Sequence, residues 1–370
     1  MKMTKIGITG SDGLIGYHLR VFLRIINDIE VKLANRDTFL SDELLSKFTK
    51  DLDVIVHLAD TNVGLDEEIK EKNILITNQL ISASKVSEIK PHIIFASSTH
   101  IFLNPNAAYS KSKVECGNRL KEWSKSNDSK FTNLIIPHVF GEFGKPFYNS
   151  VISSFCHQLA IGEETKIIQD KELDLLHAYD VAKGIYQVIK NSNIGDHRLS
   201  GCLITVSDVR SRLIAITEDY LRNVFPNLTD NLDYQLFNTF RSYLKNDYYP
   251  RHFDLHTDNR GSLFEAVKSK QSGLTFFSTT KPGITRGNHY HINKFERFIV
   301  THGKASIKFR KLFTNDVVSY EVDGDQPTYV DIPTYTTHNI TNTGEDDLTT
   351  LFWSNVFYDE NNPDTYFEEV

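Results

Sequence analysis

Apolar positions in the first half of the chain alternate between short strand-like runs and longer helical patterns. Runs rich in β-branched residues occupy positions 6–9, 31–34, 54–58, 93–97 and 134–137. Between the first two runs, Ile15, Leu19, Phe22, Leu23 and Ile26 follow the repeat of a helix with one apolar face. This alternation predicts a doubly wound parallel sheet, the Rossmann-like class of α/β fold.

The pattern changes after about residue 243. From Phe253 onward, short apolar runs are separated by Gly, Pro, Asn and Asp, as at residues 274–278, 297–300, 305–309, 317–322 and 348–353. Many short strands with turn residues between them predict an all-β barrel or jelly roll. We therefore predict two domains, residues 1–245 and 246–370, with a linker near residues 246–251.

Composition and charge limit the classes of function. The chain of 370 residues is longer than one hydrophobic core usually supports, and its net charge of −7 comes without a block of Lys and Arg, so nucleic acid is not expected as a partner. Cys116, Cys156 and Cys202 lack the spacing of a disulfide framework or a thiolate zinc site. Without a signal-peptide pattern or a long apolar span, we expect a cytoplasmic protein that does not span a membrane.

A glycine-rich turn stands where the first predicted strand gives way to the first helix. Its residues are Gly10, Ser11, Asp12, Gly13, Leu14, Ile15 and Gly16. Glycines at this place allow a tight turn, backbone approach to a pyrophosphate and close packing of helix on strand, and the helix N-terminus attracts phosphate. The turn therefore predicts a dinucleotide site, although a purely structural turn would carry the same residues.

The end of the second predicted strand indicates which dinucleotide binds. An acidic residue there would accept the ribose hydroxyls of NAD, but the chain has Arg36, which suits the 2′-phosphate of NADP. We therefore predict NADPH as the cofactor. In the alternative interpretation, Arg36 lies on a solvated loop and pairs with the adjacent Asp37.

Three residues suit proton transfer to a carbonyl oxygen. Tyr109 and Lys113 stand four residues apart on a predicted helix, and therefore on one face of it. A lysine at this place should lower the pKa of the phenol by favouring the phenolate, which helps transfer near neutral pH. Ser98, at the end of the run 93–97, could supply a hydroxyl to the same oxygen. A chance pair on a surface helix is the alternative.

Together these features resemble the extended short-chain dehydrogenase family. The resemblance rests on the glycine turn, His57-Leu58-Ala59, Ser98 and Tyr109-x-x-x-Lys113. It implies that Leu58, Ala59, Tyr109 and Lys113 contact the dinucleotide. It also implies that Ser98, Tyr109 and Lys113 form the catalytic set and that the substrate is a nucleotide sugar.

Two positions depart from the pattern of that family. Asp60 stands where a glycine often follows the Leu-Ala pair. His138 stands where an asparagine is usual, in a segment that the resemblance places against the substrate. We therefore expect His138 to be a substrate-binding residue.

The second half of the chain contains a set of metal-ligand residues. His289 and His291 are separated by one residue on a predicted strand, so their side chains point to the same side and can reach one ion. Glu296 and His338 complete a set that suits zinc, iron, manganese or nickel, of which we expect zinc. In the alternative, an inherited site has lost its metal.

These ligands, with Gly283 and Gly303, resemble the first motif of the cupin family throughout. In the second motif, Tyr335 replaces the glycine before His338. Residues 258–265 also resemble the entry strand of sugar-nucleotide 3,5-epimerase cupins, which implies that Arg260 and Glu265 contact the substrate. In the alternative, Arg260 is a loop residue paired with Asp258.

A reductase of this type joined to such a cupin resembles the bifunctional enzymes of capsular-polysaccharide synthesis over essentially the whole chain. The resemblance implies that the cupin inverts C3 of a UDP-linked 4-keto-6-deoxy-N-acetylhexosamine and that the reductase then reduces C4 with NADPH. The product would be a UDP-2-acetamido-2,6-dideoxy-talose, in the route to UDP-N-acetyl-L-fucosamine. A homodimer or larger homo-oligomer is also implied.

The implied chemistry constrains the roles in the cupin. Removal of the C3 proton creates an enolate, whose oxygen needs a positive or hydrogen-bonding group such as a divalent ion. Lys281, Tyr290 and Lys294 are candidates for the catalytic base; their spacing does not choose among them, and we name Lys281 first. Inversion beside a carbonyl requires that carbonyl, so epimerisation precedes reduction.

Two other interpretations of the cupin stay open. It could be a structural or dimerising module beside a single-activity reductase or C4 epimerase. It could also be a sensor that binds a sugar nucleotide.

Overall fold

The computed structural model describes residues 3–254, 256–258, 261–263, 266–270, 273–356, 359, 361 and 363–370. The chain divides into two compact units, Met1–Ser154 with Ile167–Val209, and Phe155–Lys166 with Arg210–Val370. Among the helices of the described residues, none is long and apolar enough to cross a membrane.

The first unit is built on a parallel sheet of six strands in the order β2-β1-β3-β4-β5-β8. These strands are β1 (Thr4–Thr9), β2 (Ile29–Ala34), β3 (Val54–His57), β4 (His92–Ser98), β5 (Phe131–Ile136) and β8 (Gly195–Arg198). All neighbouring pairs in it are parallel. The chain passes from β1 to β2 on one side and continues with β3 on the other, so the strand order reverses beside β1, where such folds bind ligands.

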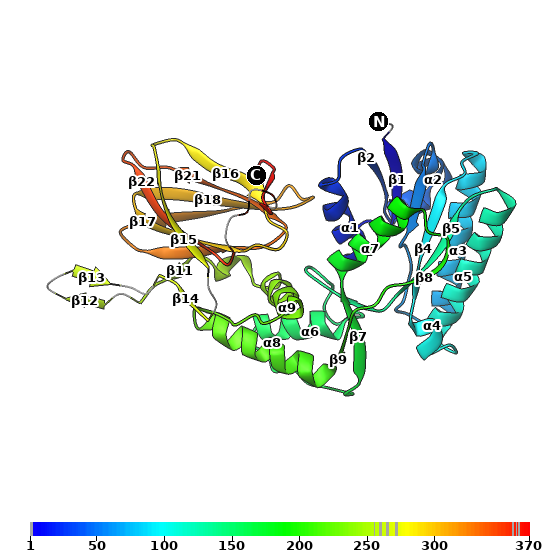
Figure 1. Ribbon diagram of the computed structural model, residues 1–370, viewed down its shortest axis with the longest axis horizontal. Coiled ribbons are helices and arrows are strands. Elements are labelled where there is room, and N and C mark those ends of the chain that lie inside the picture. The colour runs from blue at the N-terminus through cyan, green and yellow to red at the C-terminus, as the bar shows by residue number, and fades with distance from the viewer. Residues whose placement is uncertain are drawn as a thin grey trace. The chain divides into compact units, whose positions relative to one another are not determined.

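Helices cover both faces of this sheet (Figure 1). On one face α1 (Leu14–Arg24) and α7 (Ala178–Asn191) bury apolar side chains against β1, β3, β4 and β5. On the other face lie α2 (Asp42–Thr49), α3 (Asp66–Val86) and α5 (Ala108–Ser126). The predicted doubly wound sheet is therefore confirmed.

Shorter elements complete the first unit. A small sheet in the order β6-β7-β9 contains β6 (His138–Phe140), β7 (Glu172–His177) and β9 (Cys202–Thr205). The turn η1 (Asp37–Leu40) follows β2, and α4 (His100–Leu103) follows β4. Helices α6 (Val151–Ala160) and α8 (Val206–Leu221) have residues in both units.

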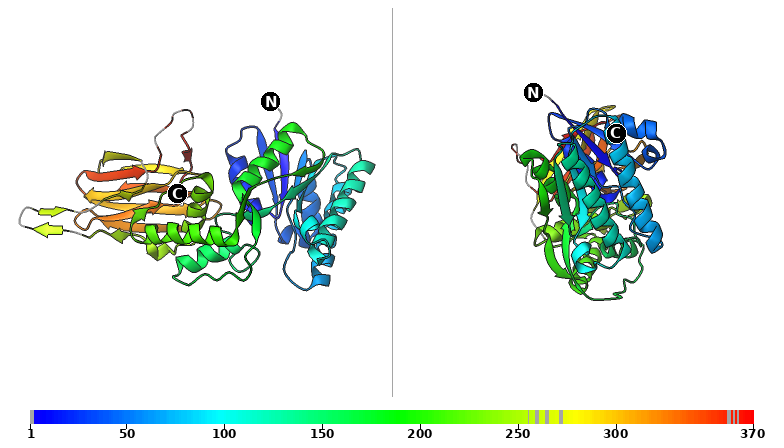
Figure 2. Two further views of the ribbon diagram at one scale, coloured as in Figure 1. Left: turned by 60° about the horizontal axis from the view of Figure 1, so that its bottom comes forward. Right: turned by 90° about the vertical axis from the view of Figure 1, so that its right-hand side faces the viewer.

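The second unit contains two antiparallel sheets of five strands, ordered β11-β20-β17-β22-β15 and β19-β18-β21-β16-β23 (Figure 2). The first sheet consists of β11 (Arg251–His252), β15 (Leu274–Thr280), β17 (Glu296–His302), β20 (Thr328–Ile332) and β22 (Leu348–Ser354). The second consists of β16 (Thr285–Tyr290), β18 (Lys304–Lys311), β19 (Val317–Asp323), β21 (Thr336–Asn342) and β23 (Tyr366–Phe367). One buried apolar cluster draws on both sheets, as expected for a cupin jelly roll.

Two short strand pairs accompany these sheets. Strands β12 (His256–Asp258) and β13 (Gly261–Leu263) form an antiparallel pair. Strands β10 (Val224–Phe225) and β14 (Lys268–Ser269) pair in parallel.

Helical residues before the barrel pack with it in the same compact unit. Besides α8 from Arg210 onward, these are α9 (Asn231–Arg241) and the turn η2 (Asn246–Tyr248). Phe237 of α9 meets the Phe295 ring edge to face at 5.0 Å, and Arg241 donates to the carbonyl of Ile332 at 2.7 Å. The unit thus begins earlier than residue 246, because a change from helices to strands is not a packing boundary. That the two activities divide at residue 246 stays a prediction, because packing alone does not test it.

A buried polar cluster ties α1 and the junction between β7 and α7 to the segment after β6. The Nε2 atoms of His18 and His177 lie 3.1 Å and 2.9 Å from Oε2 of Glu142. Nδ1 of His177 accepts the backbone N–H of Tyr179, so its Nε2 carries hydrogen and donates to the carboxylate. Three ligand atoms lie within 4.8 Å of one another, but Nε2 of His177 carries hydrogen and so donates to Glu142 rather than binding a metal. Nδ1 of His18 donates to the carbonyl of Leu14 at 2.9 Å, and we call these three side chains a hydrogen-bonded clamp.

We predict that Glu142→Gln destabilises the first unit by about 3–5 kcal/mol, because it breaks a buried charged cluster. Burial alone would raise the pKa of Glu142, but His177 and His18 lower it below the usual 4.5. The stabilisation is therefore present at neutral pH and lost as the pH falls below 4.5.

Urea unfolding at several pH values, followed by circular dichroism, measures this effect. The control is Glu115→Gln, in a half-exposed pair with Arg119, for which we expect a loss of about 0.5 kcal/mol or less. Equal losses in the two variants at pH 7 would contradict the clamp.

Candidate active site and metal centre

A cleft of about 1120 Å³ opens at the carboxyl edge of the parallel sheet. Residues that follow β1, β3 and β4 line it, as expected for ligand sites in doubly wound folds. The predicted site residues that it brings together are Gly10, Asp12, Gly13, Leu14, Ile15, Gly16, Arg36, Leu58, Ala59, Ser98, Tyr109, Lys113 and His138. Ser11 is instead buried below the turn.

The glycine turn has the close packing that a dinucleotide cradle needs. Gly10 adopts a left-handed φ of +66°, and a Cβ built on it would lie 2.8 Å from the backbone nitrogen of Ala59. A Cβ on Gly16 would lie 2.3 Å from the carbonyl oxygen of Gly10. Side chains are therefore excluded at both positions, and the start of α1 faces the cleft with free backbone N–H groups.

Thr9 organises the loop after β3, a role that no motif had indicated. Its buried hydroxyl accepts the backbone N–H groups of Leu58 and Ala59 at 3.1 Å and 3.2 Å and lies 2.7 Å from Nδ1 of His57. Burial, and then the charge of Lys113, lower the pKa of His57 to about 3. The imidazole is therefore neutral and can accept the hydroxyl proton of Thr9.

Tyr109 and Lys113 face the cleft from one side of α5, and Asp60 joins them from the loop after β3. The Lys113 ammonium lies 2.7 Å from Oδ2 of Asp60 and donates to the carbonyl of Ala96 at 2.6 Å. The Tyr109 hydroxyl donates to the same Asp60 oxygen at 3.2 Å. Ser98, the last residue of β4, accepts the backbone N–H of His100 at 3.2 Å and lines the same cleft.

The pKa of Tyr109 shifts upward, opposite to the direction that the sequence predicts. Burial raises the pKa of the Tyr109 phenol, the charge of Lys113 lowers it, and Asp60 raises it further, so the net shift is upward. The sequence expectation considered Lys113 alone. In this arrangement Tyr109 holds its proton and suits the role of a proton donor.

Two further cleft residues, Arg36 and His138, offer polar groups to a ligand. Arg36 is exposed and makes no ion pair with a described residue, Asp37 included. The Nε2 atom of His138 is buried without a hydrogen-bond partner among the described residues. Burial, with His100 and Lys171 adding to it, lowers the pKa of His138 to about 4, so its imidazole is neutral near pH 7.

In the second unit, the four predicted metal ligands converge. One ligand atom from each of His289, His291, Glu296 and His338 lies within 4.8 Å of the others. His289 lies on β16 and His338 on β21, and these two residues pair directly across the strands. Nε2 of His291 lies 3.3 Å from Oε2 of Glu296, the first residue of β17.

Hydrogen bonds and burial prepare these side chains to bind a cation. Nδ1 of His291 donates to the carbonyl of Asp364 at 2.7 Å, and Nδ1 of His338 donates to that of Thr336 at 3.2 Å, which leaves both Nε2 lone pairs for the centre. Burial and the neighbouring histidines lower the pKa of His289 to about 4 and lower that of His338. Neutral histidines beside a carboxylate fit a divalent transition metal.

Tyr335 keeps the turn that the missing glycine would provide. It adopts a left-handed φ of 57°, and its backbone N–H donates to the carbonyl of His291 at 2.8 Å. This conformation costs a non-glycine residue about 1–2 kcal/mol, which tight packing around the buried ring offsets.

The candidate bases differ in position. Lys281 is 77% exposed and pairs with Asp347 at 2.8 Å, so its assignment as the base finds no support in this arrangement. Lys294 instead lies 3.2 Å from Glu296. Tyr290 is buried and stacks on Tyr366. Arg260 and Glu265, the predicted substrate contacts, lie outside the described residues.

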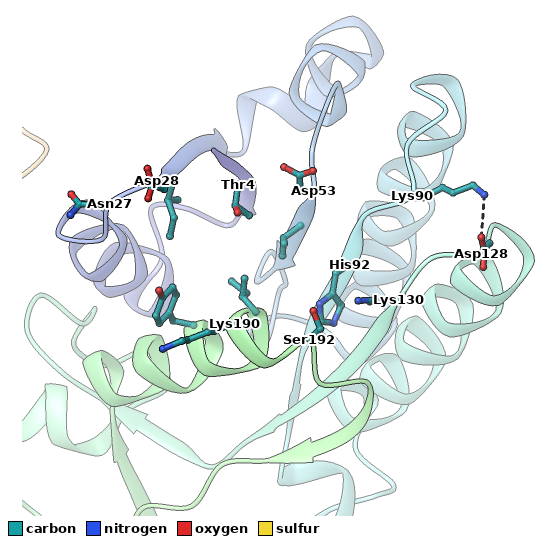
Figure 3. A pocket seen from close by; sticks show the side chains of 14 residues that line it. Thr4, Asn27, Asp28, Asp53, Lys90, His92, Asp128, Lys130, Lys190 and Ser192 are labelled. Atoms are coloured by element: carbon teal, nitrogen blue, oxygen red, sulfur yellow. Dashed lines mark hydrogen bonds and ion pairs between the residues drawn. The ribbon is translucent and has the colours of Figure 1, made fainter. Parts of the chain in front are cut away.

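Another cavity, of about 620 Å³, lies at the amino edge of the same parallel sheet (Figure 3). Its lining includes Thr4 and His92, the first residues of β1 and β4, and the pair of Lys90 and Asp128 at 3.3 Å. Because parallel α/β sheets bind ligands at the carboxyl ends of their strands, the cleft and not this cavity is the candidate active site.

Two family models match the sequence. The model of the NAD dependent epimerase/dehydratase family matches residues 6–199. The model of the Polysaccharide biosynthesis C-terminal domain matches residues 256–366. The first match contains the cleft residues from Gly10 to Lys171, and the second contains the four metal-ligand candidates.

Curated proteins are similar to the whole chain or to part of it. A UDP-2-acetamido-2,6-beta-L-arabino-hexul-4-ose reductase from Pseudomonas aeruginosa is 28% identical over 373 residues, covering 98% of this chain and 98% of that protein. Spore coat polysaccharide biosynthesis protein SpsL from Bacillus subtilis is 26% identical over 119 residues, which cover 30% of this chain and 79% of SpsL.

The solved structures agree with this similarity. The crystal structure of the capsular polysaccharide assembling protein CapF from Staphylococcus aureus is 31% identical, with a TM-score of 0.63, and the match covers 99% of this chain and 100% of that chain. The resemblance expected from the sequence is thus confirmed. The chain belongs to the NAD dependent epimerase/dehydratase family, and over its whole length it is similar to CapF.

Proposed function

We propose that this protein is a bifunctional sugar-nucleotide enzyme of surface-polysaccharide biosynthesis. Its barrel inverts C3 of a UDP-linked 4-keto-6-deoxy-N-acetylhexosamine, and its first unit then reduces the C4 ketone with NADPH. The product is a UDP-2-acetamido-2,6-dideoxy-talose, which leads to UDP-N-acetyl-L-fucosamine. The observation that carries the proposal is that Tyr109 and Lys113 line one cleft with the glycine turn. Similarity to the 4-ketose reductase over 98% of both chains supports the substrate class.

In the reductase cleft, NADPH supplies a hydride for C4. Tyr109 donates its phenolic proton to the carbonyl oxygen as the negative charge develops there, and Ser98 donates a hydrogen bond to the same oxygen. The charge of Lys113 stabilises the phenolate that forms. His138 binds the sugar through its unpaired Nε2 atom.

In the barrel, a divalent cation, proposed to be zinc, supplies a Lewis acid on His289, His291, Glu296 and His338. The two Nδ1–H bonds to backbone carbonyls orient His291 and His338 for this role. Positive charge at this place favours removal of the proton next to the ketone. Because only the ketone makes that proton acidic, inversion comes first.

Deuterium wash-in at C3 tests the epimerase. We expect the 4-keto sugar nucleotide to take up deuterium from solvent without NADPH, and we expect Tyr109→Phe to keep this exchange. His289→Ala should lose it, whereas His302→Ala, at an exposed histidine of the same unit, should not. Absence of exchange in the wild type would leave the barrel as a structural or sensing module.

Metal analysis tests the ligand set separately from activity. We expect about one divalent ion per purified chain, and we expect His338→Ala to lose most of it because three ligands hold a cation less well than four. Chelation should lower the melting temperature of the wild type, since bound metal stabilises the folded state. Full metal content in His338→Ala would contradict the assignment.

Cofactor choice tests the role of Arg36. Since a charged hydrogen bond to phosphate contributes about 1.5–3 kcal/mol, Arg36→Ala should lower kcat/KM for NADPH by roughly 10- to 100-fold. The same variant should use NADH as the wild type does. Comparable wild-type kcat/KM for NADPH and NADH would count against this role.

A further inference from the structure

Asp60 occupies a position in the reductase cleft that neither the family match nor the similar proteins explain. It follows β3, lines the cleft, and its side chain is 25% exposed. One of its carboxylate oxygens contacts both members of the proposed Tyr-Lys pair, at 2.7 Å from the Lys113 ammonium and 3.2 Å from the Tyr109 hydroxyl. A single carboxylate therefore bridges the proton donor and its neighbouring cation.

The bridge changes the charge that Tyr109 faces. The Lys113 side chain is only 4% exposed, so its charge needs partners, and it finds them in Asp60 and the carbonyl of Ala96. With Lys113 neutralised in this way, a phenolate on Tyr109 would stand beside the negative charge of Asp60. Loss of the Tyr109 proton would also remove the hydrogen bond that this carboxylate now accepts.

We propose that Asp60 is a positioning residue that keeps Tyr109 protonated and aimed at the substrate, so that the cleft works as a proton donor from neutral into alkaline pH. The inference rests on the proposed reductase function. Ketone reduction needs the protonated phenol: the nicotinamide C–H bond of NADPH breaks and its hydride forms a C–H bond at C4, leaving NADP⁺. The C=O bond becomes C–O, and the Tyr109 O–H bond breaks as the new O–H bond forms. Solvent then returns a proton to the phenolate.

The histidines, the cysteine and the second tyrosine near this pair carry little charge in the relevant range. His57 of β3 has a pKa lowered to about 3, and burial also lowers the pKa of His100, whose ring centroid lies 6.4 Å from that of Tyr109. Burial raises the pKa of Cys116 on α5 and that of Tyr148 after β6. The charged residues Arg36, Asp37, Lys145 and Lys171 line the same cleft, but the charges that shift the pKa of Tyr109 are those of Lys113 and Asp60.

Electrostatics agree with the contacts. Burial raises the pKa of Tyr109, Lys113 lowers it, and both the charge of Asp60 and its hydrogen bond raise it. Burial lowers the pKa of Lys113, but Asp60 and Tyr109 outweigh burial, so the lysine stays charged. Replacing Asp60 by a neutral residue removes an upward contribution at Tyr109 and leaves the downward one.

The test is the pH dependence of kcat/KM for reduction of the UDP-linked 4-keto sugar with saturating NADPH. The alkaline limb of this profile reports the group that must be protonated. We expect Asp60→Asn to move this limb to lower pH by about one unit or more, the size of effect that a charge at this range produces. Asp60→Glu should restore a limb close to that of the wild type.

Controls separate this role from general effects. Asp128→Asn removes the same charge at the amino edge of the sheet and should leave the profile unchanged. Asp60→Ser is the second neutral variant if Asp60→Asn does not fold. An ultraviolet titration measures the ionisation of Tyr109 without substrate, as the difference between the wild type and Tyr109→Phe. In the neutral Asp60 variants we expect it to show a lower pKa of the Tyr109 phenol.

The outcomes distinguish the two proposals. If Tyr109→Phe reduces the ketone at the wild-type rate, the proposed reductase role of Tyr109 is wrong. If Tyr109→Phe is inactive but the neutral Asp60 variants keep the wild-type alkaline limb and phenolate titration, the role of Asp60 is wrong and the reductase proposal stands. The inference is supported if the alkaline limb moves to lower pH in both neutral variants while the pH profile of Asp128→Asn stays that of the wild type.

Discussion

Backbone pairing of β1, β3 and β4 is the constraint on which the proposed reductase site depends. Thr9 pairs with His57, and His57 pairs with Phe95, so the three strands end at one edge of the sheet. This places the Gly10 turn, the Asp60 loop and Ser98 around one cleft, although up to 88 residues of chain separate them. Parallel strands cannot be joined by a tight turn, so helices such as α5 return across the sheet and add Tyr109 and Lys113 to the same edge.

Burial then decides the protonation state of each group at this edge. The Lys113 ammonium, removed from water, is held by Asp60 and the carbonyl of Ala96, while His57 is neutral and bonded to Thr9. The half-buried phenol of Tyr109, beside a carboxylate, keeps its proton. A reductase that must deliver a proton to a ketone benefits from this state.

The barrel uses the same physical effect for a different purpose. Burial and the neighbouring histidines lower the pKa of His289 and His338, which leaves their nitrogen lone pairs for a cation. The pKa of Glu296 is lowered: burial alone would raise it, but His291 and Lys294 outweigh burial. Each proposed activity thus has its own polar site, and in the proposed scheme the two act on one ketone in a fixed order.

The sequence by itself determined the two fold classes and located the glycine turn, the Tyr109–Lys113 pair and the four candidate metal ligands, because each of these follows from a local repeat or a short spacing. Only the tertiary structure decided how distant segments meet. It brought Asp60 onto Tyr109 and Lys113, used the hydroxyl of Thr9 to hold the next loop, and grouped the helices after Arg210 with the barrel. It also left Lys281 at the surface, paired with Asp347. These outcomes depend on burial and on contacts between charges that are distant in the sequence. Neither leaves a regular pattern of residues along the chain.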